Sequence, residues 1–367
     1  MSFIGKTGSF IGLNALRNLV SDTMAIDMGS ANTIIAVRGR GVAIDEPSVI
    51  AVNKVTGEVI AVGNEARKMQ GREARDVAVI APLVGGVVAD FERTKSMLDH
   101  FVRQARSGIS HFSRRAIMSV LSGVTQVEQR ALLSAAEEAR ISRVYMIEEG
   151  QAAAIGAGVP LHDEHAAAVV DIGGGTTNVA AIVSGSIIAS HAARIGSADI
   201  DASIMDRLRR HRGLTIGIPT AERLKIELGS AIEPRDPDKR LEVRGRDVQT
   251  GSPGAVEISA AEVFAVTQPI IRRISEEVRL MLTELAPEVA GDIFDRGLIL
   301  TGGGALMEGL PQYLQKELGL SIRVADEPRF AIVRGLTQLF EEPLLLRRVA
   351  RTEPRSLVDT EATAFGT

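Results

Sequence analysis

The chain has 367 residues, 45% of them hydrophobic, and its 42 basic and 46 acidic side chains give a formal net charge of −4. This size predicts more than one hydrophobic core and therefore two domains. A net acidic chain with no Trp and only two Tyr lacks the basic face and stacking side chains of nucleic-acid binders, so we expect no nucleic-acid partner. The absence of cysteine excludes disulfides and thiolate metal sites.

Residues 1–23 form an N-terminal extension before the first strand-like run. The segment from Phe3 to Leu19 has scattered apolar residues but not the continuous apolar core of a secretory signal. No apolar run in the chain reaches the roughly 18 residues that a membrane-spanning helix needs. We therefore expect a cytoplasmic protein whose extension is a candidate for membrane association.

Two acidic, glycine-containing turns run from Asp27 to Thr33 and from Asp171 to Thr177, each between two apolar runs. Glycine lets consecutive backbone N–H groups approach an anion, and hydroxyls add further donors. The hydroxyls in question belong to Ser30, Thr33, Thr176 and Thr177. An Asp beside a bound anion requires a cation between them, and Mg²⁺ is commonly held by one or two carboxylates plus substrate phosphates. The two turns together predict a clamp for a Mg-nucleotide.

The sequence after each turn repeats the same order of short β-branched runs separated by a tight glycine break, over residues 33–44 and 177–189. This repetition predicts a duplicated α/β domain with a nucleotide held between the copies. The remaining runs, in chain order, predict a small β layer at 46–65, a helix at 94–106, a strand at 115–121, a helix at 128–139, a strand at 142–147, helices at 151–158, 199–210 and 220–228, a hairpin or loop at 233–255, a helix at 260–285 and a strand at 297–300.

These residues resemble the actin, sugar-kinase and heat-shock ATPase superfamily, and within it the MreB family of bacterial actins. The resemblance is collinear from about residue 24 to about residue 340, and it is carried by the two turns and by residues 46–49, 86–91, 152–158, 221–229 and 301–304. It implies an α/β, actin-like fold with two duplicated RNase H-like domains, each bearing a small subdomain, and Mg-ATP in the central cleft.

The resemblance also implies domain limits. Domain I would cover residues 24–155, with a small β subdomain at about 38–65 and a last segment at about 330–345 that returns to it. Domain II would cover residues 156–329, with its small subdomain at about 190–258. Residues 346–367 are expected to form a polar tail.

Site residues follow from the resemblance by position. Asp27 and Asp171 would hold Mg²⁺ through its water molecules. The nucleotide would contact Asp27, Gly29, Ser30, Ala31, Asn32, Gly173, Gly174, Gly175, Thr176, Thr177, Glu222, Lys225, Gly302, Gly303, Gly304 and Ala305. Without the resemblance, Glu222 and Lys225 are simply an i, i+3 pair on a helix surface, which typically contributes roughly 0.2–0.5 kcal/mol.

Glu149 and Thr176 are the predicted catalytic residues. Glu149 is similar in position to the second acid of the family's Glu-Glu-Pro segment, which orients the attacking water, while Thr176 helps to place it. Gly150 stands here where the family has proline, and Gln151 follows. Because glycine does not fix φ as proline does, we expect a slow ATPase. The alternative for Glu149 is a solvated acid at a strand end.

The function implied is that of an ATP-dependent cytoskeletal protein. Its membrane-associated filaments, with paired protofilaments, would guide cell-wall synthesis and rod shape. Its partners would be other copies of itself, the inner face of the cytoplasmic membrane and the cell-wall elongation machinery. The alternative is a non-polymerising actin-fold ATPase. A chaperone of this superfamily needs a substrate-binding domain after the ATPase, and a kinase needs a base that faces an acceptor; neither stands out in the sequence.

A second membrane contact is predicted between the helix at 94–106 and the strand at 115–121. Ile109 and Phe112 lie there among four arginines, similar in position to the family's membrane-inserting loop. His111 lies between them, where a wholly apolar tip would be expected. The alternative is an ordinary loop packed on its own domain.

Overall fold

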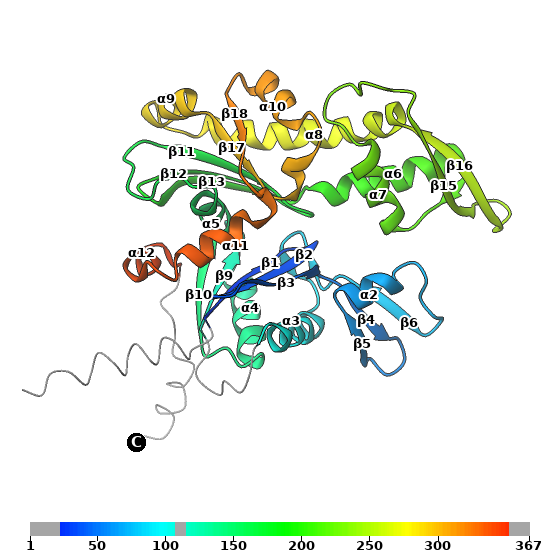
Figure 1. The fold of residues 1–367 in the computed structure, drawn as a ribbon, viewed down its shortest axis with the longest axis horizontal. Coiled ribbons are helices and arrows are strands. Elements are labelled where there is room, and N and C mark those ends of the chain that lie inside the picture. Colours follow the sequence, from blue (N-terminus) through cyan, green and yellow to red (C-terminus); the bar gives the residue numbers. More distant parts are fainter. Residues whose placement is uncertain (1–22, 107–114, 352–367) are drawn as a thin grey trace, which may run out of the picture.

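Two five-stranded sheets form the centres of two domains in the computed structural model, which describes residues 23–106 and 115–351 (Figure 1). The first sheet has the order β10-β9-β1-β2-β3 and the second the order β13-β12-β11-β17-β18. The strands of the first are β1 (Thr23–Met28), β2 (Asn32–Val37), β3 (Gly41–Pro47), β9 (Arg115–Val120) and β10 (Arg143–Glu148). Those of the second are β11 (Ala167–Ile172), β12 (Thr177–Val183), β13 (Ser186–Ala193), β17 (Leu298–Thr301) and β18 (Ile322–Val324).

The two sheets repeat one topology. In each, the first three strands form an antiparallel meander, β1-β2-β3 or β11-β12-β13. The first strand of each meander also pairs in parallel with a later strand, β1 with β9 and β11 with β17. The duplication predicted from the sequence is therefore confirmed, and each acidic turn joins the first two strands of its sheet.

Two short helices, α5 (Glu149–Gly156) and α11 (Ala331–Gln338), lie between the two sheets (Figure 1). The apolar cluster around them takes side chains from both domains, such as Ala25 and Ile117 from the first sheet and Val169 and Ile182 from the second. Gly156 and Gly335 allow the two helices to cross closely, because glycine has no Cβ atom. A Cβ on Gly156 would meet the backbone of Ala331, and a Cβ on Gly335 would meet the backbone of Ala152. This crossing joins the two domains through one shared core.

The outer faces are covered by amphipathic helices with well-formed N-termini. In domain I, α3 (Phe91–Ala105) begins at the Asp90 cap and α4 (Gln126–Glu138) at a capping box of Thr125 and Glu128. In domain II, the covering helices are α8 (Ala260–Thr283), α9 (Pro287–Arg296) and α10 (Leu310–Leu318), and short 3₁₀ turns η1 (Gly303–Leu306) and η2 (Pro328–Phe330) lie near the central sheet.

The small sheet of domain I has the order β5-β4-β6 and consists of β4 (Ile50–Asn53), β5 (Val59–Val62) and β6 (Val77–Ile80), beside α2 (Asn64–Met69). It lies further along the chain than the expected 38–65, because β3 continues the β2 hairpin within the large sheet. A two-stranded ribbon, β7 (Leu83–Val84) and β8 (Val87–Val88), leads back to the domain.

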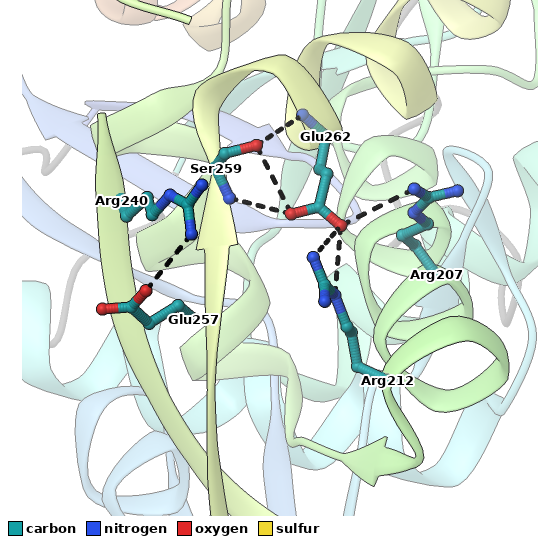
Figure 2. A network of polar contacts seen from close by, with 6 residues as sticks. All are labelled: Arg207, Arg212, Arg240, Glu257, Ser259 and Glu262. Carbon is teal, nitrogen blue, oxygen red and sulfur yellow. Dashed lines mark hydrogen bonds and ion pairs between the residues drawn. The ribbon is translucent and has the colours of Figure 1, made fainter. Parts of the chain in front are cut away.

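The small subdomain of domain II combines α6 (Ser197–Arg212), α7 (Ile218–Leu228) and a sheet of β14 (Leu214–Thr215), β15 (Arg240–Asp247) and β16 (Pro253–Ser259). Figure 2 shows polar contacts that join β15 to β16 and α6 to the start of α8. Ser259 and Glu262 form the capping box of α8, and one Glu262 oxygen also accepts from Arg212 at 2.8 Å and pairs with Arg207 at 3.6 Å. The end of α6 is thereby tied to the start of α8.

The chain after residue 345 differs from the expected polar tail. Helix α12 (Pro343–Val349) runs through this point, and its Leu345 and Val349 are buried against the inter-sheet cluster. Residues 352–367, the extension at 1–22, and Ile109 and Phe112 of the predicted membrane loop all lie outside the described residues. Within residues 23–106 and 115–351, no helix is long and apolar enough to span a bilayer.

Candidate functional site

Two buried carboxylates lie at equivalent positions near the ends of β1 and β11, one in each domain. Asp27 is the penultimate residue of β1 and Asp171 that of β11, and they are only 9% and 4% exposed. Each accepts a hydrogen bond from a hydroxyl on the parallel neighbouring strand: Ser119 Oγ donates to Asp27 at 2.7 Å, and Thr301 Oγ1 donates to Asp171 at 2.9 Å. Among the described residues no cation pairs with either carboxylate, so the site lacks a positive charge that a ligand could supply.

The electrostatics of these carboxylates fit a bound cation. Burial raises the pKa of Asp27 to about 6, against the opposing hydrogen bond from Ser119. Burial and the charge of Asp27 raise the pKa of Asp171 to about 7, against hydrogen bonds from Thr301 and Asn178. In the described residues, no three acidic, histidine or cysteine side chains converge for direct metal ligation. A hydrated Mg²⁺, which keeps several waters and takes one or two carboxylates, fits this donor set.

Glu149 lies beside this pair, at the first residue of α5, and is 7% exposed. Burial raises the pKa of its carboxyl well above the usual value, and the charges of Asp27 and Asp171 raise it further. Asn178 Nδ2 donates to Glu149 Oε2 at 2.6 Å. The predicted catalytic acid is therefore enclosed by protein rather than solvated.

Gly150 and Gln151 hold α5 in place without the family's proline. A Cβ on Gly150 would come within 2.6 Å of the Ala180 Cβ, so glycine lets the helix pack directly on β12. Gln151 Nε2 donates to the carbonyl of Gly185 at 2.6 Å, in the turn between β12 and β13. These two contacts anchor the helix turn that carries Glu149.

The first acidic turn is braced by side chains. Gly29 N donates to Asn32 O at 3.0 Å, closing the turn, and Ser48 Oγ donates to Gly29 O at 2.6 Å. Asn32 Nδ2 donates to Asp45 at 2.9 Å, and Arg329 from η2 pairs with the same carboxylate at 3.1 Å. The turn is therefore tied both to β3 and to the segment that returns from domain II.

The second acidic turn is braced by backbone groups. Gly173 N donates to Thr176 O at 2.8 Å, and the first residues of α6, Ser197 and Ala198, donate to Gly173 O and Gly174 O at 3.0 and 2.8 Å. A Cβ added to Gly174 would collide with Ala31 of the first turn. The structure thus brings the two predicted phosphate turns into contact.

Two predicted hydroxyl donors are turned away from the site, which corrects the sequence expectation. Thr33 and Thr177 are fully buried, each at the strand position that follows its turn. Thr33 Oγ1 shares a 2.9 Å hydrogen bond with Ser48 Oγ, and Thr177 Oγ1 donates to the carbonyl of Ile195 at 2.9 Å. These threonines close their turns, so their hydroxyls are not free for phosphate.

The other two hydroxyls remain available to a ligand. Ser30 Oγ accepts from Gly86 N at 2.7 Å and keeps its own proton to donate. The Thr176 hydroxyl forms no hydrogen bond with the described residues, although Thr176 is only 8% exposed. The Thr176 hydroxyl can therefore donate to a ligand, and its catalytic role stays a prediction.

The third glycine segment packs on the second turn. Gly302 has φ +80°, and Cβ atoms at Gly302 and Gly304 would both meet Ile172. Gly303 and Ala305 lie in η1, which Gly302 joins to the end of β17. The segment predicted to approach the nucleoside is thereby fixed against β11.

Glu222 and Lys225 both project from α7 but contact different partners. Glu222 forms an ion pair with Arg67 of α2, which links the small subdomains of the two domains. Lys225 Nζ contacts the Asp201 carboxylate at 2.8 Å and the carbonyl of Ser197 at 3.1 Å. Their contact with ribose and adenine stays a prediction.

Three polar residues beside the predicted site were given no site role from the sequence: Ser119, Thr301 and Asn178. Ser119 and Thr301 become evident once β1 and β11 are paired in parallel with β9 and β17. Asn178 becomes evident from the antiparallel register, which places it opposite Asp171.

The chain matches the family model described as MreB/Mbl protein over residues 21–347. It belongs to the MreB/Mbl family. The cell shape-determining protein MreB of Escherichia coli K12 is 41% identical over 328 residues, covering 88% of this chain and 94% of that protein. The cell shape-determining protein Mbl of Bacillus subtilis 168 is 39% identical over 315 residues, covering 85% of this chain and 93% of that protein.

Solved structures of the family have the same fold. MreB5 of Spiroplasma citri bound to ADP superposes with a TM-score of 0.83 at 31% identity, covering 89% of this chain and 98% of that chain. The same protein bound to AMPPNP gives a TM-score of 0.83 at 32% identity, covering 88% and 97%. The MamK double helical filament, at 20% identity, a TM-score of 0.73 and coverage of 87% and 99%, supports the fold alone. The expected actin-like architecture is thus confirmed.

Proposed function

We propose that this family member is an actin-like cytoskeletal subunit that binds Mg-ATP between its domains, assembles into filaments and helps to determine cell shape. The observation that carries the proposal is the contact between two glycine turns, each with a buried Asp that no cation from residues 23–106 or 115–351 neutralises. Support comes from relatives named for cell-shape determination and from a similar structure bound to ADP.

Nucleotide binding would use the residues predicted from the sequence. Asp27 and Asp171 would hold hydrated Mg²⁺, which neutralises phosphate charge. Backbone N–H groups of the two turns would contact the phosphates, and Ser30 and Thr176 would add hydroxyl donors. Glu149 would orient the attacking water, because positioning and electrostatics account for most catalysis of phosphoryl transfer.

Assembly would proceed by a repeated head-to-tail contact, which forms an open filament when its rotation does not close a ring. Nucleotide between the domains would bias their closure and so the strength of that contact. Sedimentation with Mg-ATP, compared with EDTA, tests this, with Asp171→Asn as the matched control. We expect the parent chain to pellet only with Mg-ATP. A parent that binds ATP yet stays monomeric at high concentration would instead support the non-polymerising ATPase.

Membrane attachment is a further part of the proposal and rests on the sequence. Ile109 and Phe112 would insert at the inner face of the cytoplasmic membrane, and many copies along a filament would gain avidity. We expect Phe112→Ser to reduce pelleting of assembled filaments with anionic liposomes while the critical concentration stays unchanged. Phe294→Ser, which alters a 68% exposed Phe on α9, is the matched control. Equal pelleting of parent and Phe112→Ser would place attachment elsewhere, with residues 1–23 as the next candidate.

The cellular role would be to guide the cell-wall elongation machinery from paired protofilaments at that membrane. Deletion of the gene, followed by complementation with the parent chain or with Asp171→Asn, tests it. Loss of rod shape that only the parent restores is the expected result. Unchanged cell shape after deletion would refute the cell-shape role without affecting nucleotide binding.

A further inference from the structure

One position breaks the symmetry of the duplicated sheets. Asp27 on β1 faces Ile34 on β2, and at the equivalent point Asp171 on β11 faces Asn178 on β12. Ile34 packs into the apolar cluster between the sheets. Asn178 is just as buried, at 1% exposure, but it brings an amide to the acidic side of the site.

The amide of Asn178 has one end engaged and the other unpaired. Its Nδ2 donates to Glu149 Oε2 at 2.6 Å, and the amide also hydrogen-bonds the Asp171 carboxylate. Its Oδ1 is buried and has no hydrogen-bond partner among the described residues. Buried polar atoms are nearly always paired in native proteins, so this oxygen indicates a missing donor.

The chemistry around the unpaired oxygen limits what that donor can be. Oδ1 and the Glu149 carboxylate are both acceptors and lie on adjacent side chains, so a phosphate oxygen is repelled and a molecule with two donors is favoured. Water has two O–H donors. A water held by both acceptors keeps a lone pair free to attack a phosphorus atom.

We propose that Asn178 is a positioning residue for hydrolysis, with its Oδ1 and the Glu149 carboxylate accepting the two hydrogens of the attacking water. This inference rests on the proposed Mg-ATP function. In the reaction, the water oxygen bonds to the terminal phosphorus as the bond from that phosphorus to ADP breaks. The proton lost by the water is accepted by Glu149, and ADP and phosphate are the products.

The first test separates catalysis from binding. Asn178→Leu keeps the approximate shape but removes both hydrogen-bonding ends of the amide. We expect the rate of phosphate release at saturating Mg-ATP to fall by about a hundredfold, as for a misplaced reacting group. At saturation, any loss of affinity caused by removing the hydrogen bond to Asp171 does not enter the measured rate. A folded variant that releases phosphate as fast as the parent chain overturns the proposal.

A second readout does not depend on turnover. ADP–aluminium fluoride mimics the reacting phosphate together with its in-line water. Asn178→Leu should weaken binding of this complex by a larger factor than it weakens binding of Mg-ADP, whereas a merely structural role would weaken both equally. Thermal unfolding without nucleotide reports whether each variant folds, and Asn178→Ser is the substitute if the leucine variant does not.

A double-mutant cycle links the two acceptors. If they hold one water, Asn178→Leu should add little to the slowing already caused by Glu149→Ala. Fully additive effects would mean separate roles and would overturn the proposal. A parent chain that fails to bind Mg-nucleotide at all would instead refute the proposed function, so the two failures are distinguishable.

Discussion

The two acidic turns have the same frame but different surroundings. In both, an Asp near the end of a strand accepts from a hydroxyl on the parallel neighbour, Ser119 in one and Thr301 in the other. The first turn is braced by side chains such as Ser48, whereas the second receives backbone N–H groups from the start of α6. The shared part suits a metal held equally from both domains.

The difference between the turns lies on the strand after each one. The residue opposite Asp27 is the apolar Ile34, whereas the residue opposite Asp171 is the polar Asn178. The proposed metal binding would therefore draw on both copies, while Asn178, which hydrogen-bonds Glu149, comes from the second copy alone. Binding and hydrolysis should be separable by mutation.

The largest expected effect is the loss of either aspartate. Asp27→Asn and Asp171→Asn each remove a negative charge opposite Mg²⁺. Mutating a residue that only hydrogen-bonds a metal ligand typically lowers metal affinity roughly 10–100-fold, so each of these variants should weaken Mg-dependent ATP binding by more than that. ATP affinity measured with Mg²⁺ and with EDTA checks this. Full Mg-dependent affinity in one of the two variants would show that only one domain holds the metal.

The pH dependence follows from the raised pKa values, about 6 for Asp27 and about 7 for Asp171. Between the unfolded value of 3.8 and these values the folded chain binds more protons than the unfolded chain. The stability of the nucleotide-free protein should therefore fall as pH rises through this window, and remain lower above it.

Mg-nucleotide binding should show the opposite trend, since Mg²⁺ needs ionised carboxylates. We expect affinity to rise between pH 5.5 and 8, by up to about tenfold per pH unit for each proton released. Thermal unfolding and calorimetric titration across this range measure both trends, and Asp171→Asn should flatten them. A nucleotide-free stability that rises with pH would contradict the assignment.

A smaller effect is expected from the two hydroxyls. Ser119→Ala and Thr301→Ala each remove the hydrogen bond that lowers the pKa of its Asp. Hydrogen bonds to charged groups contribute about 1.5–3 kcal/mol, so each variant should bind Mg-ATP about tenfold or more weakly at pH 7. Similar losses of affinity in the two variants would show that the two hydroxyls contribute equally. A loss in only one variant would show that only one turn depends on its hydroxyl.

The smallest effect should come from Arg329→Ala, which removes a brace of the first turn only. The Arg329 and Asp45 side chains are 42% and 27% exposed, and partly exposed pairs of this kind contribute about 0.2–1 kcal/mol. We expect a small drop in melting temperature and less than a threefold change in ATP affinity. Lys68→Ala, at an exposed ion pair on α2, is the control and should leave ATP affinity unchanged.

Much of the fold was predictable because the repeated strand–turn–strand pattern is local. The same pattern located Asp27 and Asp171, since a short motif specifies both the turn and its acid. The inward direction of Thr33 and Thr177 was missed because it depends on which strand face is buried. The third strand of the small sheet, β6, was missed because it pairs with β4 only after the chain has passed through α2.

Asn178 and helix α12 are two features that the sequence alone could not predict. The role of Asn178 depends on the register of β12 against β11 and on the packing that brings Glu149, at the start of α5, within hydrogen-bond distance. A local sequence motif specifies neither of these. Helix α12 is short and rich in arginine, and only the apolar cluster between the domains explains why Leu345 and Val349 are buried.

The crossing of α5 and α11 has a consequence for the two aspartates of the acidic turns. Gly156 and Gly335 let the two helix backbones touch, and these helices also contact both central sheets. The thickness of this contact acts as a spacer that fixes how far β1 lies from β11, and hence how far Asp27 lies from Asp171. One added methyl group at the crossing would widen the gap between the carboxylates without touching either of them.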